Sequence, residues 1–407
     1  MNQNISSIST FTHTRANTRR LDRWIRTEFK QLNTELEQQY SGLDSPGQVS
    51  TTGLGLKQEL ATQGGDLISS LLREGNTDEG FDSGFDLLGN VGFFMAACRR
   101  HEIDSEKTPQ FDSHLLDASA LSMQLGASLG VVPRFSSAHL ETHNTAINGE
   151  YKSFTSLKDE QLFLQYNTRG VFAFIRASEA LLHTLPLGIS HPVTFDLLSV
   201  AKSALEDVVS NNQALFDKLD TDRFFYNVRP YYKPHKVGRH EYRGANAGDF
   251  AGINAIDLLL GLCRADDAYY SQLLVDKFLF MRPEDQLTLR DCMRRSSLMD
   301  DFLDSLAADH KDQSWYQKNL AVFIEVCEAH GQTALQHHNM LIKKFIEKPA
   351  NQAELTDRAD LTASGPPLPV LLRSLKKLCD FRCAANVDGL NTRFHDLEKL
   401  RHSVLPK

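Results

Sequence analysis

A histidine lies in the middle of the apolar face of a helix that we expect to end at Ile346. Six residues recur at three- and four-residue intervals and share one stripe of that helix: Ala334, Leu335, His338, Leu341, Ile342 and Phe345. His337 lies about 100° further round and is the weaker candidate for an enclosed role. A neutral imidazole in an apolar wall suits axial ligation of heme iron, with its Nδ1–H bonded to an acceptor. From spacing alone, a hydrogen-bonded core histidine is the commoner explanation.

An aromatic segment in the middle of the chain surrounds an arginine. The run FFYNVRPYY spans residues 224–232 and contains Phe224, Phe225 and Arg229. The planar guanidinium of Arg229 could pair with the carboxylate of a substrate or cofactor through its fork of donors. It could equally stack on the aromatic rings as a structural residue, and the sequence leaves both alternatives open.

A run of small residues follows and leads into an apolar helix that carries Asp257. Small side chains let a backbone approach a flat ligand closely, and the residues concerned are Ala245, Asn246, Ala247 and Gly248. The run contains G-x-x-x-G, but no strand precedes it and no GK[ST] follows. Phosphate-loop and dinucleotide-binding motifs are therefore excluded, and an ordinary loop and helix start is the structural alternative.

A metal site built from several histidines has less support in the sequence. HExxH is absent, and the adjacent His337 and His338 point in different directions on a helix. His139 and His143 form one HxxxH pair that would share a helix face, but zinc would need a third ligand that no motif identifies.

The elements that must position these residues are helices. Apolar residues recur at helical intervals through most of the chain, and alternating strand-like runs are nearly absent, so we expect an all-α fold. Turn-forming residues cluster between 144 and 158. We therefore predict a smaller, mostly helical N-terminal domain over 1–150 and a large helical domain over 151–407, which would enclose the cofactor.

Composition narrows the class of protein. The chain has 407 residues, 41% of them hydrophobic, and a formal charge of -8 without a concentrated basic face, so nucleic-acid binding is not expected. Six cysteines without a CxxC pair predict a reducing, cytoplasmic protein. The apolar stretches are much shorter than the roughly 20 residues that cross a bilayer, so we expect no membrane association.

In this order, the motifs resemble the superfamily of indoleamine 2,3-dioxygenase and tryptophan 2,3-dioxygenase, which includes the pyrrolnitrin-pathway heme enzyme monodechloroaminopyrrolnitrin synthase. FFYNVRPYY is similar to the Phe-Phe-x-x-x-Arg-x-Tyr segment of that superfamily, and GANAGDFAGINAIDLLLGL to its loop and Asp-x-Leu-Leu-Gly helix. HHNMLIKKFIEKP resembles the helix that carries the proximal heme ligand, and TASGPPLPVLL the substrate loop. The likeness is clearest over 160–380, while 80–101 and 133–144 look more like the pyrrolnitrin enzyme.

The resemblance implies a role for each matched position. His338 matches the proximal iron ligand, Arg229 the arginine on the substrate carboxylate, and Phe224 and Phe225 the aromatic pair of the pocket. Two loops match as well: Ala245, Asn246, Ala247 and Gly248 over the distal heme face, and Ala363, Ser364 and Gly365 over the substrate. His139 matches a histidine of the pyrrolnitrin enzyme and could be a distal group, with a core or surface histidine as the alternative.

Three departures accompany these matches. Leu335 stands where relatives have an arginine near a heme propionate, although that arginine's partner, Asp257, is present. The propionate contacts must therefore differ from those of relatives. Val171 and Ile175 replace an expected phenylalanine and serine of the substrate pocket, so the substrate need not be tryptophan itself.

The resemblance implies a heme b enzyme that takes an indole compound and O₂ as its small-molecule partners. Our first hypothesis is a dioxygenase that inserts both oxygen atoms across the indole C2–C3 bond of tryptophan or a derivative. The alternatives are a heme enzyme that rearranges a tryptophan derivative, as in pyrrolnitrin-type metabolism, and a non-catalytic heme-binding protein. Sequence does not specify the oligomeric state.

Overall fold

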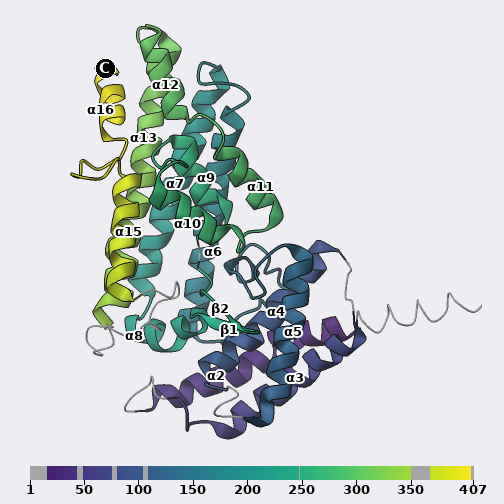
Figure 1. Ribbon diagram of the computed structural model, residues 1–407. Coiled ribbons are helices and arrows are strands. Elements are labelled where there is room, and N and C mark those ends of the chain that lie inside the picture. Colours follow the sequence, from purple (N-terminus) through teal and green to yellow (C-terminus); the bar gives the residue numbers. More distant parts are fainter. Residues whose placement is uncertain are drawn as a thin grey trace, which may run out of the picture. The chain divides into compact units, whose positions relative to one another are not determined.

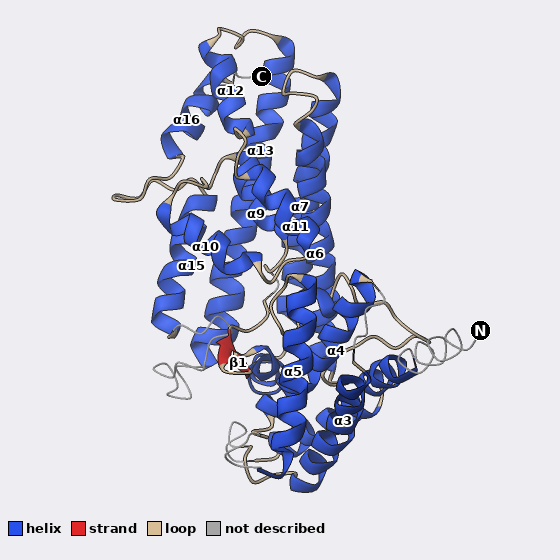
Figure 2. Cartoon of the chain, turned by 45° about the vertical axis from the view of Figure 1, so that its right-hand side comes forward, coloured by secondary structure: helices blue, strands red, loops and turns tan. Residues whose placement is uncertain are grey.

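Helices make up most of the parts of the chain that the structure describes. The computed structural model describes residues 16–43, 49–75, 80–103, 109–246, 248–349 and 367–404. Within these ranges the strands are confined to one antiparallel hairpin, β1 (His235–Val237) and β2 (His240–Tyr242), in which Val237 pairs with His240 (Figure 2). The expected all-α fold is confirmed. No helix in the described ranges is long and apolar enough to cross a membrane.

The chain forms two compact units. Unit 1 contains the described residues up to Leu164 together with Leu219–Asn246, and unit 2 contains Gln165–Lys218 and the described residues after Asn246. Unit 1 therefore takes a segment from the middle of the chain that carries Arg229. The boundary near residue 150 that we predict between two consecutive domains stays a prediction.

Unit 1 is a set of helices around an aromatic core. Its main elements are α2 (Glu28–Ser41), α3 (Leu54–Glu74), α4 (Phe81–Arg100), α5 (Asp112–Leu129), α8 (Thr221–Arg223), the π-helical η3 (Phe224–Val228) and the 3₁₀ turns η1 (Pro109–Phe111), η2 (Ser137–His139) and η4 (Arg229–Tyr232) (Figure 1). The rings of Phe93, Phe135 and Phe154 meet at centroid distances of 5.2–5.5 Å, and Phe154 stacks on Tyr231 at 4.4 Å. Aromatic burial of this kind is the main apolar contribution to a core.

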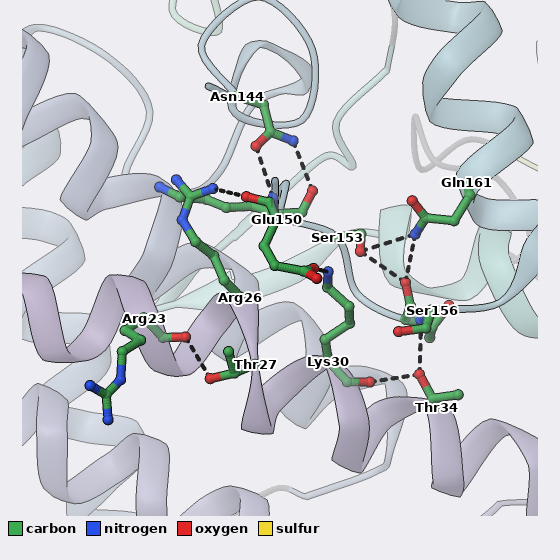
Figure 3. Close-up of polar contacts among 12 residues, drawn as sticks. Arg23, Arg26, Thr27, Lys30, Thr34, Asn144, Glu150, Ser153, Ser156 and Gln161 are labelled. Atoms are coloured by element: carbon green, nitrogen blue, oxygen red, sulfur yellow. Dashed lines mark hydrogen bonds and ion pairs between the residues drawn. The ribbon is translucent and has the colours of Figure 1, made fainter. Parts of the chain in front are cut away.

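The segment between 144 and 156 is bonded to the N-terminal helices of unit 1 (Figure 3). Arg26 donates to the carbonyl oxygens of Thr145 and Glu150, and Lys30 pairs with the Glu150 carboxylate at 2.8 Å. Asn144 exchanges two hydrogen bonds with the backbone of Lys152. The turn-rich segment is thus an ordered part of unit 1.

A buried carboxylate organises the start of α6 (Lys158–Thr184). Glu160 is inaccessible to solvent and accepts bonds from the backbone N–H groups of Phe154 and Thr155 and from the Thr155 hydroxyl, at 2.6–2.7 Å. Burial nevertheless outweighs these donors and raises the pKa of Glu160 to about 7.

Unit 2 is a layered helical bundle. It contains the rest of α6 and the helices α7 (Pro192–Lys218), α9 (Ala251–Leu260), α10 (Ala268–Phe278), α11 (Pro283–Cys292), α12 (Leu298–Ala307), α13 (Ser314–Gln336), the π-helix η5 (His337–Glu347), α15 (Leu368–Arg382) and α16 (Phe394–Ser403). The apolar residues of α7 recur at three- and four-residue intervals, and Leu198, Ala201, Leu205 and Val208 are all buried. That face packs along α13, and α13 also lies against α15 (Figure 1). The bundle thereby fixes the helix that carries His337 and His338.

The first prediction concerns the pH dependence of stability. Glu160 has a raised pKa in the folded chain, so the folded state binds more protons than the unfolded state between pH 4.5, the usual pKa of a glutamate, and about pH 7. Its contribution to stability is complete below pH 4.5 and is lost as the pH rises to 7. We expect the free energy of unfolding to fall over this range by about 3 kcal/mol more in the wild type than in Glu160→Gln. Urea denaturation at several pH values measures this, with the exposed Glu241→Gln as control, and equal slopes in all three proteins would contradict it.

Candidate functional site

The helix that carries the two histidines changes its winding at the first of them. α13 ends at Gln336, and η5 continues it as a π-helix over His337–Glu347. A π turn closes its hydrogen bond one residue later than an α turn, so residues in η5 are rotated relative to an α-helical count. Such segments occur frequently at functional sites. The faces of His337 and His338 therefore do not follow from α-helical spacing.

His337 is the first residue of η5 in unit 2. Its side chain is exposed, yet desolvation by the surrounding protein is the largest cause that lowers its pKa, to about 4. The positive charges of Arg382 and Lys277 act in the same direction. The imidazole of His337 is therefore held in its neutral form near pH 7.

His338 has different surroundings. Its side chain is only 7% exposed, and its Nδ1 has no hydrogen-bond partner among the described residues. It lines a groove of about 560 Å³ whose other walls carry mainly charged residues, among them Lys343, Glu347, Lys376 and Asp380. Burial, together with Lys343 and Lys376, lowers the pKa of His338. Its role as iron ligand stays a prediction.

Asp257 is the centre of a buried polar network in unit 2. Its carboxylate is fully buried and accepts two bonds from Arg382, one from Nε and one from Nη2, both at 2.8 Å. The Nε2 of His330 and the hydroxyl of Tyr270 each donate to it at 2.7 Å. Arg382 and the His330 bond hold the pKa of Asp257 well below its usual range, against the opposing effect of burial. The predicted site residue Asp257 is thus ionised and tied to three other helices.

Arg382, His330 and Tyr270 are absent from the sequence-based set. Asp257 alone gave a signal in the sequence, because Leu335 replaces the arginine that it would pair with in relatives and the carboxylate then needs another partner. The sequence contains 44 Lys and Arg residues and does not indicate which of them returns to Asp257. Arg382 follows Asp257 by 125 positions, so only the packing of α15 against α13 identifies it.

Two predicted pocket residues lie on α6 within unit 2. Val171 is buried and Ile175 is half-buried, and the Ile175 carbonyl oxygen accepts a bond from Ser178 at 2.9 Å. Gly248 also belongs to unit 2, and its carbonyl oxygen accepts a bond from Lys277 at 3.0 Å. Gly248 is therefore connected to the same lysine whose charge acts on His337.

Arg229 and its aromatic neighbours lie in unit 1. Arg229 is 6% exposed, and its guanidinium lies 5.4 Å from the ring centroid of Phe225, within cation–π range. Phe224 is buried and contacts Phe163 at a centroid distance of 5.1 Å. The structure therefore brings Arg229 and Phe225 together as the sequence predicts, and leaves open whether the arginine also binds a carboxylate.

A second buried carboxylate holds this aromatic segment in place. Glu37 of α2 is fully buried and accepts bonds from Arg100 Nε at 2.7 Å and Nη2 at 2.8 Å. Arg100 also donates to the Tyr226 carbonyl oxygen, and the side chain of Asn227 donates to Glu37 at 2.9 Å. The segment that contains Arg229 is thus anchored at Tyr226 and Asn227. Sequence reasoning missed Glu37 and Arg100, because neither lies in a motif.

His139 has both ring nitrogens engaged within unit 1. The backbone N–H of Ser136 donates to its Nδ1 at 2.9 Å, so the proton is on Nε2, which donates to the Phe85 carbonyl oxygen at 2.8 Å. Burial lowers its pKa to about 3. A Cβ at Gly89 would lie 2.3 Å from the imidazole Cδ2, which shows how closely α4 packs on this ring. The prediction that His139 is a distal group remains untested, and that role would require it to release one of these bonds.

The structure describes only some of the remaining predicted loop residues. Ala245 is buried and Asn246 is half-buried, both in unit 1. Ala247 lies outside the described residues, as does the whole predicted substrate loop with Ala363, Ser364 and Gly365.

Comparison with known families adds an independent finding. A family model with the description monodechloroaminopyrrolnitrin synthase PrnB matches residues 15–404. The match runs through both units and covers the histidine pair, the Asp257 network and the Arg229 segment. It confirms the resemblance to the superfamily that includes this synthase, and it places the chain among enzymes.

The second prediction concerns the Asp257 network. Asp257→Ala would leave the buried Arg382 and His330 without their shared acceptor, and removal of one partner from a buried ion pair typically costs about 3–5 kcal/mol. Asp266→Ala is the matched control, because its carboxylate also pairs with an arginine, Arg264, but is 69% exposed. We expect it to cost less than about 1 kcal/mol. Urea denaturation of the heme-free proteins measures both changes, and similar losses in the two variants would contradict the network's role.

Proposed function

The chain belongs to the monodechloroaminopyrrolnitrin synthase PrnB family, and from that membership we propose that it is a heme-dependent oxidoreductase acting on tryptophan or a tryptophan derivative. The observation that carries this proposal is His338, a buried imidazole that lines a groove of about 560 Å³ beside Lys343 and Lys376 and whose Nδ1 has no hydrogen-bond partner among the described residues. Neutral imidazole is the form that ligates iron, and cations suit the two propionates of heme b. The residues present therefore fit the cofactor.

We assign the iron to His338, the residue that the sequence predicts. His338 is only 7% exposed and lines the groove, and its Nδ1 has no hydrogen-bond partner among the described residues. The adjacent His337 is exposed and is the alternative ligand.

When bound, the heme supplies the iron-based activation of O₂ that side chains do not perform. The chain's own residues bind and orient the substrate. Arg229 would pair with the substrate carboxylate, and its contact with Phe225 fixes the plane of the guanidinium. Phe224 would add apolar contact area for an indole ring.

The proposal assigns separate roles to the other predicted residues. Val171 and Ile175 present apolar side chains, which favours an indole without a polar contact at these positions. The proposal also assigns two loops, with Ala245, Asn246, Ala247 and Gly248 over the cofactor and Ala363, Ser364 and Gly365 over the substrate. It does not depend on His139, whose two nitrogens already bond Ser136 and Phe85.

The family description favours rearrangement over dioxygenation. The matched family is described as a synthase of a pyrrolnitrin precursor, whereas no finding supports insertion of two oxygen atoms into an indole. We therefore propose rearrangement of a tryptophan derivative as the reaction, with 2,3-dioxygenation as the second candidate.

The third prediction tests the iron ligand. We expect His338→Ala to lose the stoichiometric Soret band of the reconstituted protein, because it removes the imidazole that lines the groove. His337→Ala is the matched control and should keep the band. Added imidazole should restore part of the Soret absorbance to His338→Ala by occupying the vacated position. Loss of the band in His337→Ala alone would transfer the ligand to His337, and a full band in both variants would refute ligation by this helix.

The fourth prediction concerns the product. Reconstituted, reduced protein is incubated with O₂ and L-tryptophan or a ring-substituted tryptophan, and the products are analysed by mass spectrometry with ¹⁸O₂ in parallel. We expect a product with an altered ring skeleton or fewer carbon atoms and without two ¹⁸O atoms. A product that retains every substrate carbon and contains both atoms of ¹⁸O₂ would instead establish dioxygenation.

A further inference from the structure

A second cavity in unit 2, of about 230 Å³, lies where the ends of three helices meet the segment that precedes a fourth. Its walls come from the turn between α9 and α10, from the last turn of α15 and from the residues before α16. The residues that matter below are Leu262, Arg264, Asp266, Asp267, Phe381 and Arg393. None of them takes part in the function proposed above, so this cavity has no assigned role.

The walls of this cavity are held by contacts within the fold. The rings of Phe381 and Tyr269 stack at a centroid distance of 6.2 Å, which joins α15 to α10. Arg393 is only 8% exposed, and it donates to Asp300 of α12 and to Asp396 of α16. Groups that are already fixed lose little conformational entropy when a ligand binds.

Two arginines line this cavity, and each keeps one nitrogen unbonded. Arg264 donates through Nε and Nη2 to the two carboxylate oxygens of Asp266. Arg393 uses the same two nitrogens for Asp396 and Asp300. Among the described residues, neither Nη1 has an acceptor. Each guanidinium is thus oriented by carboxylates and retains donors that match the carboxylate of a ligand.

Two carboxylates line the same cavity. The hydrogen bond from Arg264 and, to a smaller extent, the charge of Arg393 lower the pKa of Asp266, so these three groups act on one another. Asp267 caps α10, where its Oδ1 accepts the backbone N–H of Tyr270 at 2.8 Å. Its Oδ2 has no donor among the described residues. That oxygen is available to an ammonium group of a ligand.

The balance of charge selects the class of ligand. The lining contains two positive and two negative side chains. A simple anion that pairs with the arginines meets the repulsion of Asp266 and Asp267, and a simple cation meets the opposite difficulty. A zwitterion places a group of opposite charge against each pair. The buried Leu262 and Phe381 add a small apolar wall, which suits a short side chain.

We propose that this cavity binds a free α-amino acid with a short side chain. Its carboxylate accepts from the Nη1 groups of Arg264 and Arg393, and its ammonium group donates to Oδ2 of Asp267. The proposal does not rest on the heme-dependent function, because it uses none of the residues assigned there.

The cavity and the groove of His338 share walls but no lining residue. Asp380 lines the groove and the next residue, Phe381, lines the cavity. Leu390 and Asn391 divide in the same way. Substitutions can therefore be confined to one of the two sites.

The experiment uses the full chain, with and without added heme b, and three small probes. These are L-alanine, propionate, which lacks the ammonium group, and ethylamine, which lacks the carboxylate. Saturation-transfer NMR on the methyl resonance of each probe gives its dissociation constant. We expect L-alanine to bind the wild type at least tenfold more tightly than either other probe, because each of them loses a charge-assisted hydrogen bond.

Substitutions then locate the bound L-alanine. We expect Arg264→Met and Asp267→Asn each to weaken its binding at least tenfold, and Asp267→Asn retains an oxygen that caps α10. Arg295→Met is the matched control, because Arg295 is 49% exposed against 50% for Arg264, also pairs with an aspartate and lies outside the cavity lining. Arg373→Met changes the groove of His338 instead. Both control variants should bind L-alanine as the wild type does, and circular dichroism checks that every variant is folded.

Each contrary result overturns the proposal at a different step. Equal affinity for L-alanine and propionate would refute a zwitterion site, and unchanged binding in Arg264→Met and Asp267→Asn would refute this location. Loss of binding in Arg373→Met alone would move L-alanine to the groove. If L-alanine shows no saturable binding, the proposal fails outright. The Soret band tests the heme function separately, so the two proposals can fail independently.

Discussion

Unit 2 depends on the requirement that a fully buried carboxylate be compensated. Asp257 on α9 is inaccessible to solvent, and an ionised group there is tolerated only with close partners. It obtains them from Tyr270 on α10, His330 on α13 and Arg382 on α15. Apolar packing of α7 on α13 tolerates small displacements, whereas these bonds of 2.7–2.8 Å do not. The orientation of α13, and hence of the histidines that follow it, is set here.

The change to π geometry then decides how the two imidazoles face. His330 is bonded inside the network, and His337 lies about two turns further along, on the same face by α-helical count. The π-helix begins at His337, so the residues after it are rotated relative to that count, and His338 lines the groove beside Lys343 and Lys376. The fixed end of α13 and the wider winding of η5 together leave His338 buried in a charged groove and His337 exposed.

Sequence patterns predict the helices well and the polar partners poorly, for a physical reason. The apolar period of α7 and α13 is a local property, so Leu198 to Val208 and the stripe through Ala334 are visible along the chain. The clustering of Phe224, Phe225 and Arg229 is visible for the same reason. A buried ion pair leaves no local period: Glu37 and Arg100 are separated by 63 positions and Asp257 and Arg382 by 125. The sequence does not indicate the π-helix either, because a π turn contains one more residue than an α turn without requiring different residue types.

The two buried carboxylates have similar chemistry but different consequences. Glu37 and Arg100 form a bidentate pair whose guanidinium also reaches the Tyr226 carbonyl oxygen and covers the Tyr40 ring at 5.0 Å. Its further contacts are therefore with groups of unit 1, and it anchors the segment that carries Arg229. Arg382 makes the same bidentate contact but is 13% exposed rather than 5%, and no carbonyl or aromatic ring among the described residues takes its remaining edge. The Glu37 and Arg100 pair therefore joins segments of unit 1, whereas the Asp257 and Arg382 pair joins α9 to the last residue of α15 and leaves part of the guanidinium accessible.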